Sequence, residues 1–581
     1  MAFNFPGSWG LFPGAQFPGA QFPYTQTGAL NMDWVLTAVK SMQQQLALFI
    51  EQNALSPANP IEWSITNQYP QNKIVTHKGQ AFISKRPVPA GIDIYNEDYW
   101  IPAFQFEQAD VPFFYPESYG AVGDGVTDDY TALQACVDAA AGKGVVYLQT
   151  GSTYRSNQSI AVPSDTHIYG YGATMLFPSS HGLQNVSFGD PPPATDSNIC
   201  IFGVTFSSNG TSDGQIRLSG VKNAAIRDCG FTNIKPNGVT TGLSLTNGCC
   251  DVSVLNCSFE CPDYAIIATT ESGTKASATL YNSNINITGC RISTDWGSAI
   301  ALQGGGKNIT ISDCNIYVTG GSDNVGIGIK INEGVSADYN VHDVLISNCS
   351  FAYTTAGSTN NAAISIGNYN NNIIINGCSF NGFYNTITPN YTNGTLKLTV
   401  SDCNAVGRGI SNSPGFINAT KSATVTLNLS NCTVDNIEQA VTGGVYIDSS
   451  VNGLIVTNAG GAISLASANM FTIVSVIARA CTQPAINITS PVSGSVLNII
   501  GCSFNECSPG ASVLNLASAN ACIIGCNIST QKADTKPTYA VSSAGRVVIS
   551  GCFLYGFQTG YYNLTDGASI TTGNIERGGI G

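Results

Sequence analysis

Apolar positions after residue 200 recur in a short phrase. The phrase is an apolar residue, two small or polar residues, a cysteine, any residue and a second apolar residue, as in Ile226–Phe231. Its cysteines are Cys229, Cys257, Cys290, Cys314, Cys349, Cys378, Cys403, Cys432, Cys502, Cys526 and Cys552. The spacing varies from 24 residues (Cys290 to Cys314) to 35 residues (Cys314 to Cys349), with one longer gap before Cys502. Short strands of fixed length joined by loops of variable length predict a parallel β-helix.

The phrase also predicts how one rung is built. Ile285 and Ile287 point inward, a two-residue bend follows, and Cys290 and Ile292 point inward again. A small apolar thiol suits a stacked interior beside a bend. Metal binding needs closely grouped ligands, whereas these thiols lie one rung apart, so we interpret the cysteine ladder as packing.

A second phrase lies between the cysteines and predicts another strand in each rung, with examples at residues 242–245, 299–302 and 328–331. Its outward positions are Ser244, Ile267, Ala301, Lys330 and Ser365. These side chains predict a mostly small, flat face that suits either another subunit or a flat polymer.

The first part of the chain follows other patterns. Residues 1–30 are rich in Phe, Pro and Gly and predict an extended arm that orders against a partner. Residues 31–55 contain a helix whose apolar residues alternate in spacings of three and four, which is a heptad seam for oligomerisation and virion attachment. The alternative is one amphipathic helix packed on its own chain. The seam residues are Met32, Val35, Val39, Met42, Leu46 and Phe49.

Residues 60–110 predict a small β module, because short alternating runs lie between Gly and Pro signals. Aromatic residues recur through it at Trp63, Tyr69, Tyr99 and Trp100. Their spacing resembles small carbohydrate-binding modules of the chitin-binding type and a connector near the N-termini of phage tail proteins. The alternative interpretation is that these aromatic residues form the core of the module.

Residues 115–175 predict a capped helix that leads into the first rungs, and residues 176–581 the remaining β-helix. Asp124-Gly125 predicts a turn, Thr127 or Asp128 a helix cap, and residues 129–141 the helix. The helix would cover the open end of the solenoid. We interpret the acids of this segment as structural, because capping explains them without catalysis.

This segment resembles the N-terminal signature of the pectate-lyase-like superfamily of right-handed β-helices, which includes phage tailspikes and capsule depolymerases. The resembling residues are Tyr119–Gln134, Gly142–Leu148 and Gly170–Ala173. Gln149–Ser152 departs from the family's pattern. The resemblance implies an all-β, right-handed parallel β-helix in a phage tail appendage of the short-tailed type, and it favours a homotrimer.

Composition narrows the function. The formal net charge of −13 argues against a nucleic-acid partner and disfavours anionic polymers, unless a local basic patch overrides the average. No apolar run is long enough to span a membrane. The N-terminus has no basic start and no apolar stretch, so we expect no signal peptide, synthesis in the host cytoplasm and reduced cysteines. We expect no cofactor and no metal.

Candidate chemistry lies in the acids that precede the second phrase in three successive rungs, Asp263, Asp295 and Asp323. Stacked rungs would place such carboxylates roughly 5–9.5 Å apart, the range of paired glycosidase carboxylates. Glu333 joins them as a candidate acid. The candidate substrate-binding residues are Tyr264, Trp296 and Lys330. The alternative is that Asp is a common turn residue.

The histidines add no recognisable dyad, and His181 and His342 read as loop residues. The sequence therefore predicts a virion appendage that recognises a host cell-surface polysaccharide and contacts virion neck or tail proteins through residues 1–110. Whether it cleaves the glycan, as a hydrolase or a lyase, or only binds it as an adhesin or structural fibre stays open. A secreted bacterial polysaccharide lyase is disfavoured by the missing signal.

Overall fold

The computed structural model describes residues 62–577 with gaps. The gaps are residues 72, 78–79, 97, 103–111, 179–181, 190–194, 209–214, 234–240, 262–263, 270–280, 296, 320–325, 332–339, 355–360, 391–393, 410–413, 492–494, 508–509, 531–535 and 567–568. The chain divides into two units, Met1–Asp110 and Val111–Gly581. The predicted arm and the heptad residues Met32 to Phe49 lie outside the described residues.

The described part of the first unit is a small antiparallel sheet of three strands. β1 (Ile74–His77) pairs with β2 (Gln80–Ser84), and β2 pairs with β3 (Trp100–Pro102). Its aromatic residues pack inward: Tyr69, Phe82 and Trp100 are buried and form a core with Val75, Val88 and Ile94. These side chains therefore build the module, as the alternative interpretation of its aromatic residues predicts.

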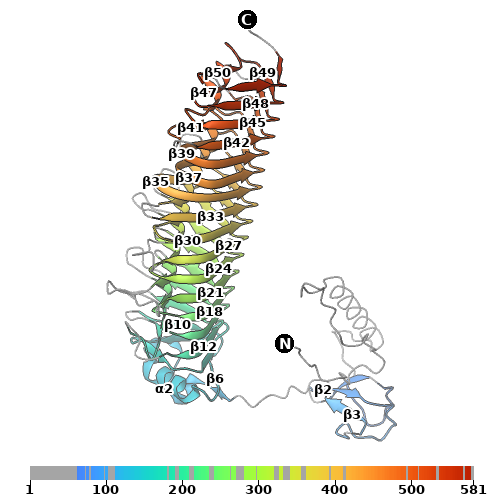
Figure 1. Ribbon diagram of the computed structural model, residues 1–581. Helices are drawn as coiled ribbons and strands as arrows, with labels where there is room; N and C mark the ends of the chain where they lie inside the picture. Colours follow the sequence, from blue (N-terminus) through green and yellow to red (C-terminus); the bar gives the residue numbers. More distant parts are fainter. Residues whose placement is uncertain are drawn as a thin grey trace. The chain divides into compact units, whose positions relative to one another are not determined.

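The second unit begins with a helical end piece. η1 (Pro116–Tyr119) precedes β5 (Asp124–Asp128) and α2 (Tyr130–Ala140), which lies at the N-terminal end of the solenoid in Figure 1. Leu133 and Val137 are buried on one face of α2. Because this face packs on the first rungs, the helix covers apolar side chains that would otherwise meet water.

The acids around α2 hold loops together, although the cap differs from the predicted one. Asp129, not Thr127 or Asp128, is the N-cap residue, and its side chain accepts hydrogen bonds from Val122 N (2.7 Å) and Gly123 N (3.1 Å). Asp124 accepts from Thr127 N at 2.7 Å. These contacts lower the pKa of Asp124, with the Thr127 backbone bond as the largest cause.

Each rung of the solenoid has three strands, which we call the first, second and third strands. Strands of the same kind pair in parallel from one rung to the next, as β20 does with β23, β21 with β24 and β22 with β25. Successive rungs therefore stack about 4.8 Å apart. The result is the predicted right-handed parallel β-helix, which Figure 1 shows as a long stack.

The first strands are β8 (Ile160–Val162), β11 (Leu183–Asn185), β14 (Ile216–Ser219), β17 (Thr241–Thr246), β20 (Tyr264–Thr269), β23 (Ser298–Leu302), β26 (Ile327–Ile331), β29 (Ala362–Ile366), β32 (Asn385–Pro389), β41 (Ile486–Ile488), β44 (Ser512–Asn515), β47 (Tyr539–Ser543) and β50 (Tyr562–Leu564). The second strands are β4 (Phe113–Phe114), β6 (Val145–Tyr147), β9 (Thr166–Tyr169), β12 (Ser197–Phe202), β15 (Lys222–Arg227), β18 (Cys250–Leu255), β21 (Asn282–Thr288), β24 (Gly306–Ser312), β27 (Val341–Ser347), β30 (Asn371–Asn376), β33 (Thr395–Ser401), β42 (Val496–Ile500), β45 (Asn520–Ile524), β48 (Val547–Ser550) and β51 (Ile570–Thr572).

The third strands are β5, β7 (Thr153–Arg155), β10 (Thr174–Leu176), β13 (Thr205–Ser208), β16 (Gly230–Asn233), β19 (Ser258–Glu260), β22 (Arg291–Thr294), β25 (Asn315–Val318), β28 (Ser350–Tyr353), β31 (Ser379–Asn381), β34 (Asn404–Val406), β36 (Thr433–Asp435), β38 (Ile455–Thr457), β40 (Ile477–Arg479), β43 (Ser503–Asn505), β46 (Asn527–Ser529), β49 (Phe553–Tyr555) and β52 (Ile575–Arg577). β35 (Gly415–Ser430), β37 (Gln439–Asn452) and β39 (Gly461–Val474) each pass through the first and second positions without a break.

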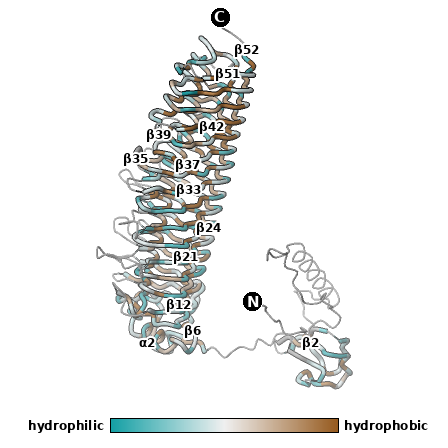
Figure 2. Tube along the Cα trace, in the orientation of Figure 1, coloured by the Kyte–Doolittle hydropathy of each residue, from teal (hydrophilic) through white to brown (hydrophobic). Residues whose placement is uncertain are grey.

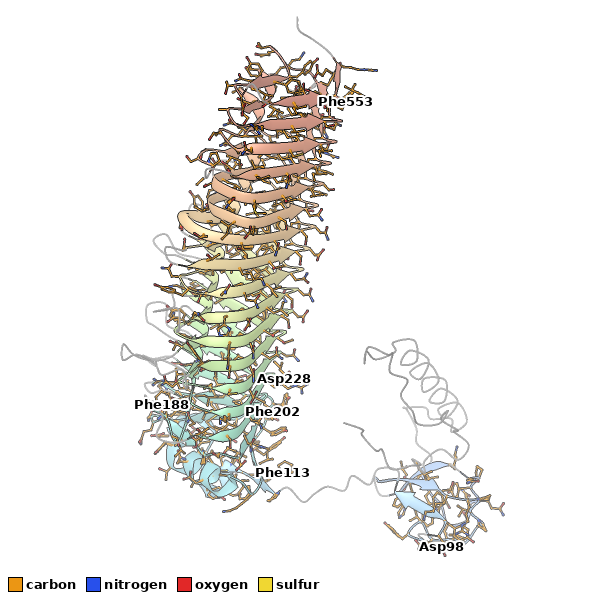
Figure 3. The ribbon with its side chains drawn as sticks, in the orientation of Figure 1. Asp98, Phe113, Phe188, Phe202, Asp228 and Phe553 are labelled. Carbon is orange, nitrogen blue, oxygen red and sulfur yellow. The ribbon has the colours of Figure 1, made fainter. Side chains whose placement is uncertain are left out.

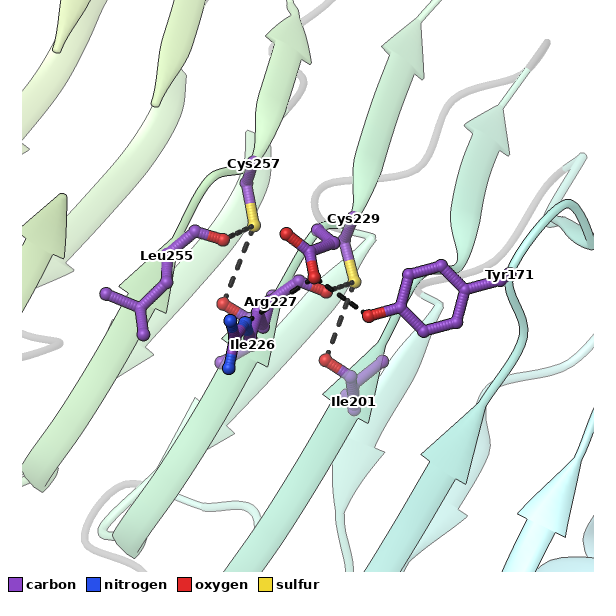
Figure 4. A network of polar contacts seen from close by, with 8 residues as sticks. Tyr171, Ile201, Ile226, Arg227, Cys229, Leu255 and Cys257 are labelled. Carbon is purple, nitrogen blue, oxygen red and sulfur yellow. Dashed lines mark hydrogen bonds and ion pairs between the residues drawn. The ribbon is translucent and has the colours of Figure 1, made fainter. Parts of the chain in front are cut away.

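The cysteine ladder lies inside the solenoid, as predicted, and all nineteen cysteines are free thiols. The ladder thiols lie beside backbone carbonyls of their own and the preceding rung, except that Cys432 contacts only Ser430 O of its own rung. Cys257 Sγ, for example, lies 3.5 Å from Ile226 O and 3.4 Å from Leu255 O (Figure 4). Aromatic residues stack beside the ladder, with the ring centroids of Phe231 and Phe259 4.4 Å apart. The interior is therefore a set of one-residue columns along the axis.

The bend before each ladder cysteine needs a left-handed backbone. Asp228 (φ 54°), Asn256 (φ 53°) and Gly289 (φ 68°) occupy this place, and Figure 3 labels Asp228. Asn, Asp and Gly adopt this conformation at little cost, which explains why they precede the cysteines. The bend turns the chain from the second strand into the third and fixes which side chains face outward.

Candidate glycan-binding surface

The outward face of the first strands has the predicted register. Ser244 pairs with Ile267, Ile267 with Ala301, Ala301 with Lys330, and Lys330 with Ser365 on successive rungs. Ser244 and Ala301 are buried and the other three are half-buried. This face therefore carries mostly small side chains that project little, and Lys330 is the one charged residue among these five.

Asp295 is exposed in the bend between β22 and β23. Its Oδ1 accepts a hydrogen bond from Thr319 Oγ1 of the next rung at 2.6 Å. This contact links the carboxylate to the next rung, and the Asp295 residue is exposed. Such an acid is placed to meet a ligand that lies along the rungs.

The other predicted site residues are spread around this face. Tyr264 is the first residue of β20 and is half-buried opposite Thr241. Lys330 lies opposite Ala301, near the far end of the first strand from Asp295. Within the described residues no hydrogen bond or ion pair joins Asp295 to Lys330. Four further predicted residues lie outside the described residues: Asp263, Trp296, Asp323 and Glu333.

A second polar surface, which the sequence did not indicate, runs along the starts of the second strands. We call it the polar track. Its first column is Ser197, Lys222, Cys250, Ser283, Lys307, His342 and Asn371, paired in register from β12 to β30. Its second column is Asn198, Asn223, Asp251, Asn284, Asn308, Asp343 and Asn372, which all have a positive φ. The track repeats polar groups at the rung spacing.

Side-chain amides link the second column from rung to rung. Asn284 Nδ2 donates to Asp251 Oδ1 at 2.8 Å, and Asn308 Nδ2 donates to Asn284 Oδ1 at 3.1 Å. Asn284 Nδ2 also lies 3.9 Å from Cys250 Sγ, so this link joins both columns of the polar track. The bonds lower the pKa of Asp251, chiefly through Asn284, so this carboxylate stays ionised.

His342 and Asp343 form a fixed pair on the track. His342 Nδ1 lies 2.7 Å from Asp343 Oδ2, and Asn372 Nδ2 donates to Asp343 Oδ1. The Asn372 bond, followed by the His342 contact, lowers the pKa of Asp343. This arrangement corrects the sequence interpretation of His342 as a loop residue, because it lies in β27.

The polar track begins at a hollow of about 590 Å³ at the N-terminal end of the solenoid. Lys143 contributes from the turn after α2, and Asp165, His167, Asn198 and Cys200 contribute from β9, β12 and the bend between β8 and β9. Burial raises the pKa of the half-buried Cys200 thiol, so this thiol is neutral rather than a reactive thiolate. The hollow is lined by both hydrogen-bond donors and hydrogen-bond acceptors.

The polar track was not predicted from the sequence, because the cysteine of each repeat served as the reference position for aligning the rungs. The signal lies earlier in each repeat, where Asn or Asp precedes an inward apolar residue, as in Asn284-Ile285, Asn308-Ile309 and Asp343-Val344. Among the described residues, no group of three or more His, Cys, Asp or Glu side chains is placed to hold a metal ion. The described helices include none that is long and apolar enough to cross a membrane.

Known proteins resemble parts of this chain, and no family model matches it. A capsule-specific depolymerase of Klebsiella phage K5-2 (depolymerase 1, K30/K69-specific) is 35% identical over 118 residues, which are 19% of this chain and 14% of the relative. The chain thus matches about a seventh of that protein's length.

Two solved structures share the architecture at low identity. The tailspike protein gp49 of Pseudomonas phage LKA1 is 13% identical with a TM-score of 0.43 and covers 71% of this chain and 83% of its own. The surface adhesin PfbA of Streptococcus pneumoniae is 17% identical with a TM-score of 0.44 and covers 63% and 92%. The right-handed parallel β-helix that the sequence predicts is established by the chain's own strand pairing.

Proposed function

We propose that the protein is a phage tail appendage that recognises a polysaccharide on the host cell surface. The observation that carries this proposal is the polar track, where hydrogen-bonding side chains repeat on each rung from β12 to β30. A polysaccharide repeats its hydroxyl groups along its length, so many weak contacts can form in register without a deep pocket. The similarity to a phage capsule depolymerase supports the same class of ligand.

Binding to host cells tests this function. Labelled protein should bind cells that carry their envelope polysaccharide and should lose binding when the polysaccharide is stripped enzymatically or genetically. The isolated polysaccharide should compete. Equal binding to stripped and intact cells would contradict the proposal and favour a protein receptor.

In this proposal residues 1–110 attach the appendage to neck or tail proteins of the virion, and the β-helices assemble as a homotrimer. Exposed apolar residues on the rungs toward the C-terminus support assembly, because such surface is usually buried against a partner. These residues are Met470, Val496, Ile500 and Ile524, and Figure 2 shows the hydropathy of their region. Sedimentation should give a trimer. Replacing Ile500 and Ile524 with Ser should weaken it, whereas the exposed Val406→Ser should not.

Cleavage of the bound polysaccharide is a second candidate function, favoured by the exposed and fixed carboxylate of Asp295. Asp263, Asp323 and Glu333 are the other candidate acids, with Tyr264, Trp296 and Lys330 as substrate contacts. Incubation with host polysaccharide should shorten the chains, and Asp295→Asn should lower the rate by orders of magnitude. Asp313→Asn is the matched control, because Asp313 is an exposed acid at another corner. An unchanged rate in Asp295→Asn would remove this residue from the site.

A further inference from the structure

Two neighbouring rungs of the polar track carry a lysine and a histidine side by side, while two other charged residues of the track, Lys222 and Asp251, lie on β15 and β18. Lys307 on β24 and His342 on β27 are direct register partners, so their backbones are about 4.8 Å apart. Both side chains leave the solenoid on the same side. Asn371 follows them on β30, and its Oδ1 is occupied by the backbone N–H groups of Asn372 (2.8 Å) and Lys397 (3.1 Å).

The imidazole of His342 is held in one orientation. Asp343 Oδ2 contacts Nδ1, and Asn372 holds the carboxylate from the next rung, so the ring has little freedom to rotate. The side chain of His342 is 35% exposed. Among the described residues His342 makes its hydrogen bond through Nδ1, which leaves Nε2 for a ligand.

An apolar platform lies on the rungs of His342 and Asn371, at Leu345 on β27 and Ile374 on β30. Leu345 and Ile374 are paired in register, and each is 36% exposed although its neighbours Val344 and Ile373 are buried. Thr310 precedes them in this column. A pyranose ring has apolar C–H faces and polar edges, so a platform next to charged groups matches one sugar residue.

We propose that Lys307 and His342 bind the carboxylate of an acidic sugar whose ring lies on Leu345 and Ile374. This inference rests on the proposed glycan-binding function and names the class of glycan, a polysaccharide that contains uronic acid. The ammonium of Lys307 donates to the carboxylate oxygens, and in the imidazolium form of His342 Nε2–H does so as well; such charge-assisted hydrogen bonds are the strong ones. Asp343 is a positioning residue, because it contacts the far side of the imidazole and not the ligand.

This subsite also revises what net charge implies. The chain carries a formal charge of −13, which disfavours anionic polymers on average. Lys307, together with the protonated form of His342 on the adjacent rung, is a local exception of the kind that overrides the average, because exposed charges more than about 10 Å away are largely screened at 0.1 M salt.

Saturation-transfer NMR with the full chain tests the subsite, with glucuronate as the probe and glucose as the neutral comparison. Glucuronate should receive clearly more saturation than glucose. Lys307→Gln and His342→Gln should each weaken glucuronate binding about tenfold, the loss expected for one charge-assisted hydrogen bond. Lys222→Gln is the matched control, because Lys222 lies in the same column without a histidine neighbour.

The positioning role has its own pair of variants. Asp343→Asn should weaken glucuronate binding. Asp251→Asn, the same change in the second column of the polar track, should not. Asn tolerates the backbone of both sites, so both variants should fold. Equal signals from glucuronate and glucose, or full binding by Lys307→Gln and His342→Gln, would overturn the inference. Binding to host polysaccharide that survives in those variants would leave the proposed function standing.

Discussion

The rung of β24 and the rung of β42 have similar interiors and different exteriors. Inside, Ile309 and Ile311 correspond to Leu497 and Ile499, and all four are buried. Outside, the last position of the strand is Ser312 in β24 and Ile500 in β42. The interior therefore specifies the solenoid in both regions, while the exterior is free to be polar for a glycan or apolar for a partner.

The largest effect on the free energy of unfolding should come from substitutions in the interior of the solenoid. Phe351 is buried and stacks on Phe380 with ring centroids 5.0 Å apart. Phe351→Ala should lower the free energy of unfolding by about 3–5 kcal/mol through lost burial and a cavity. Leu345→Ala, on the outside of the same rung region, should change it by less than about 0.5 kcal/mol. Equilibrium denaturation measures both, and similar losses would break the distinction between inside and outside.

Substitutions in the left-handed bends before the ladder cysteines should have the next largest effect on the free energy of unfolding. Gly377 and Gly525 have φ near 60° at the same place in different rungs. Gly377→Ala and Gly525→Ala should each cost about 1–2 kcal/mol for the left-handed backbone. Gly377→Ala should cost more, because its Cβ would lie 2.6 Å from Asn348 Oδ1, whereas Gly525 has nothing within 4 Å. Equal losses of unfolding free energy in the two variants would show that the Asn348 side chain moves away from the new Cβ at little energetic cost.

The cysteine ladder should have a smaller effect per residue. Cys349→Ala should cost about 1 kcal/mol, near the value for one buried methylene. Cys250→Ala should be neutral, because Cys250 lies on the polar track and is only half-buried. A neutral Cys349→Ala would mean that the ladder does not contribute to packing.

Alkaline pH should weaken the fold gradually. Burial raises the pKa of the Cys249 thiol from 9.0 to about 11. Between these values the unfolded chain binds fewer protons than the folded chain, so the free energy of unfolding falls as pH rises and is fully retained below pH 9. Denaturation at about pH 8 and about pH 10 measures the fall. Cys249→Ala should reduce it, and an unchanged pH dependence would assign the fall to other groups.

The sequence predicts the inside of this protein better than the outside. Cys290 and Ile292 repeat because each interior column admits few shapes, so their register can be read directly. His342 and Lys307 are 35 positions apart in the chain, and they become neighbours because β24 and β27 pair. That pairing depends on the loop between the strands, whose length the repeat does not specify. Asp295 was predicted as a candidate acid, and its bond to Thr319 needed the same register.

A titration of host envelope polysaccharide against the protein and two matched surface variants tests whether the glycan binds the polar track. We expect saturable binding that weakens in the polar-track variant, Lys307→Gln with His342→Gln. Binding per folded chain should persist in the apolar-surface variant, Ile500→Ser with Ile524→Ser. Unchanged binding in the polar-track variant together with lost binding in the apolar-surface variant would contradict this expectation, because the glycan would then lie on the surface assigned to assembly.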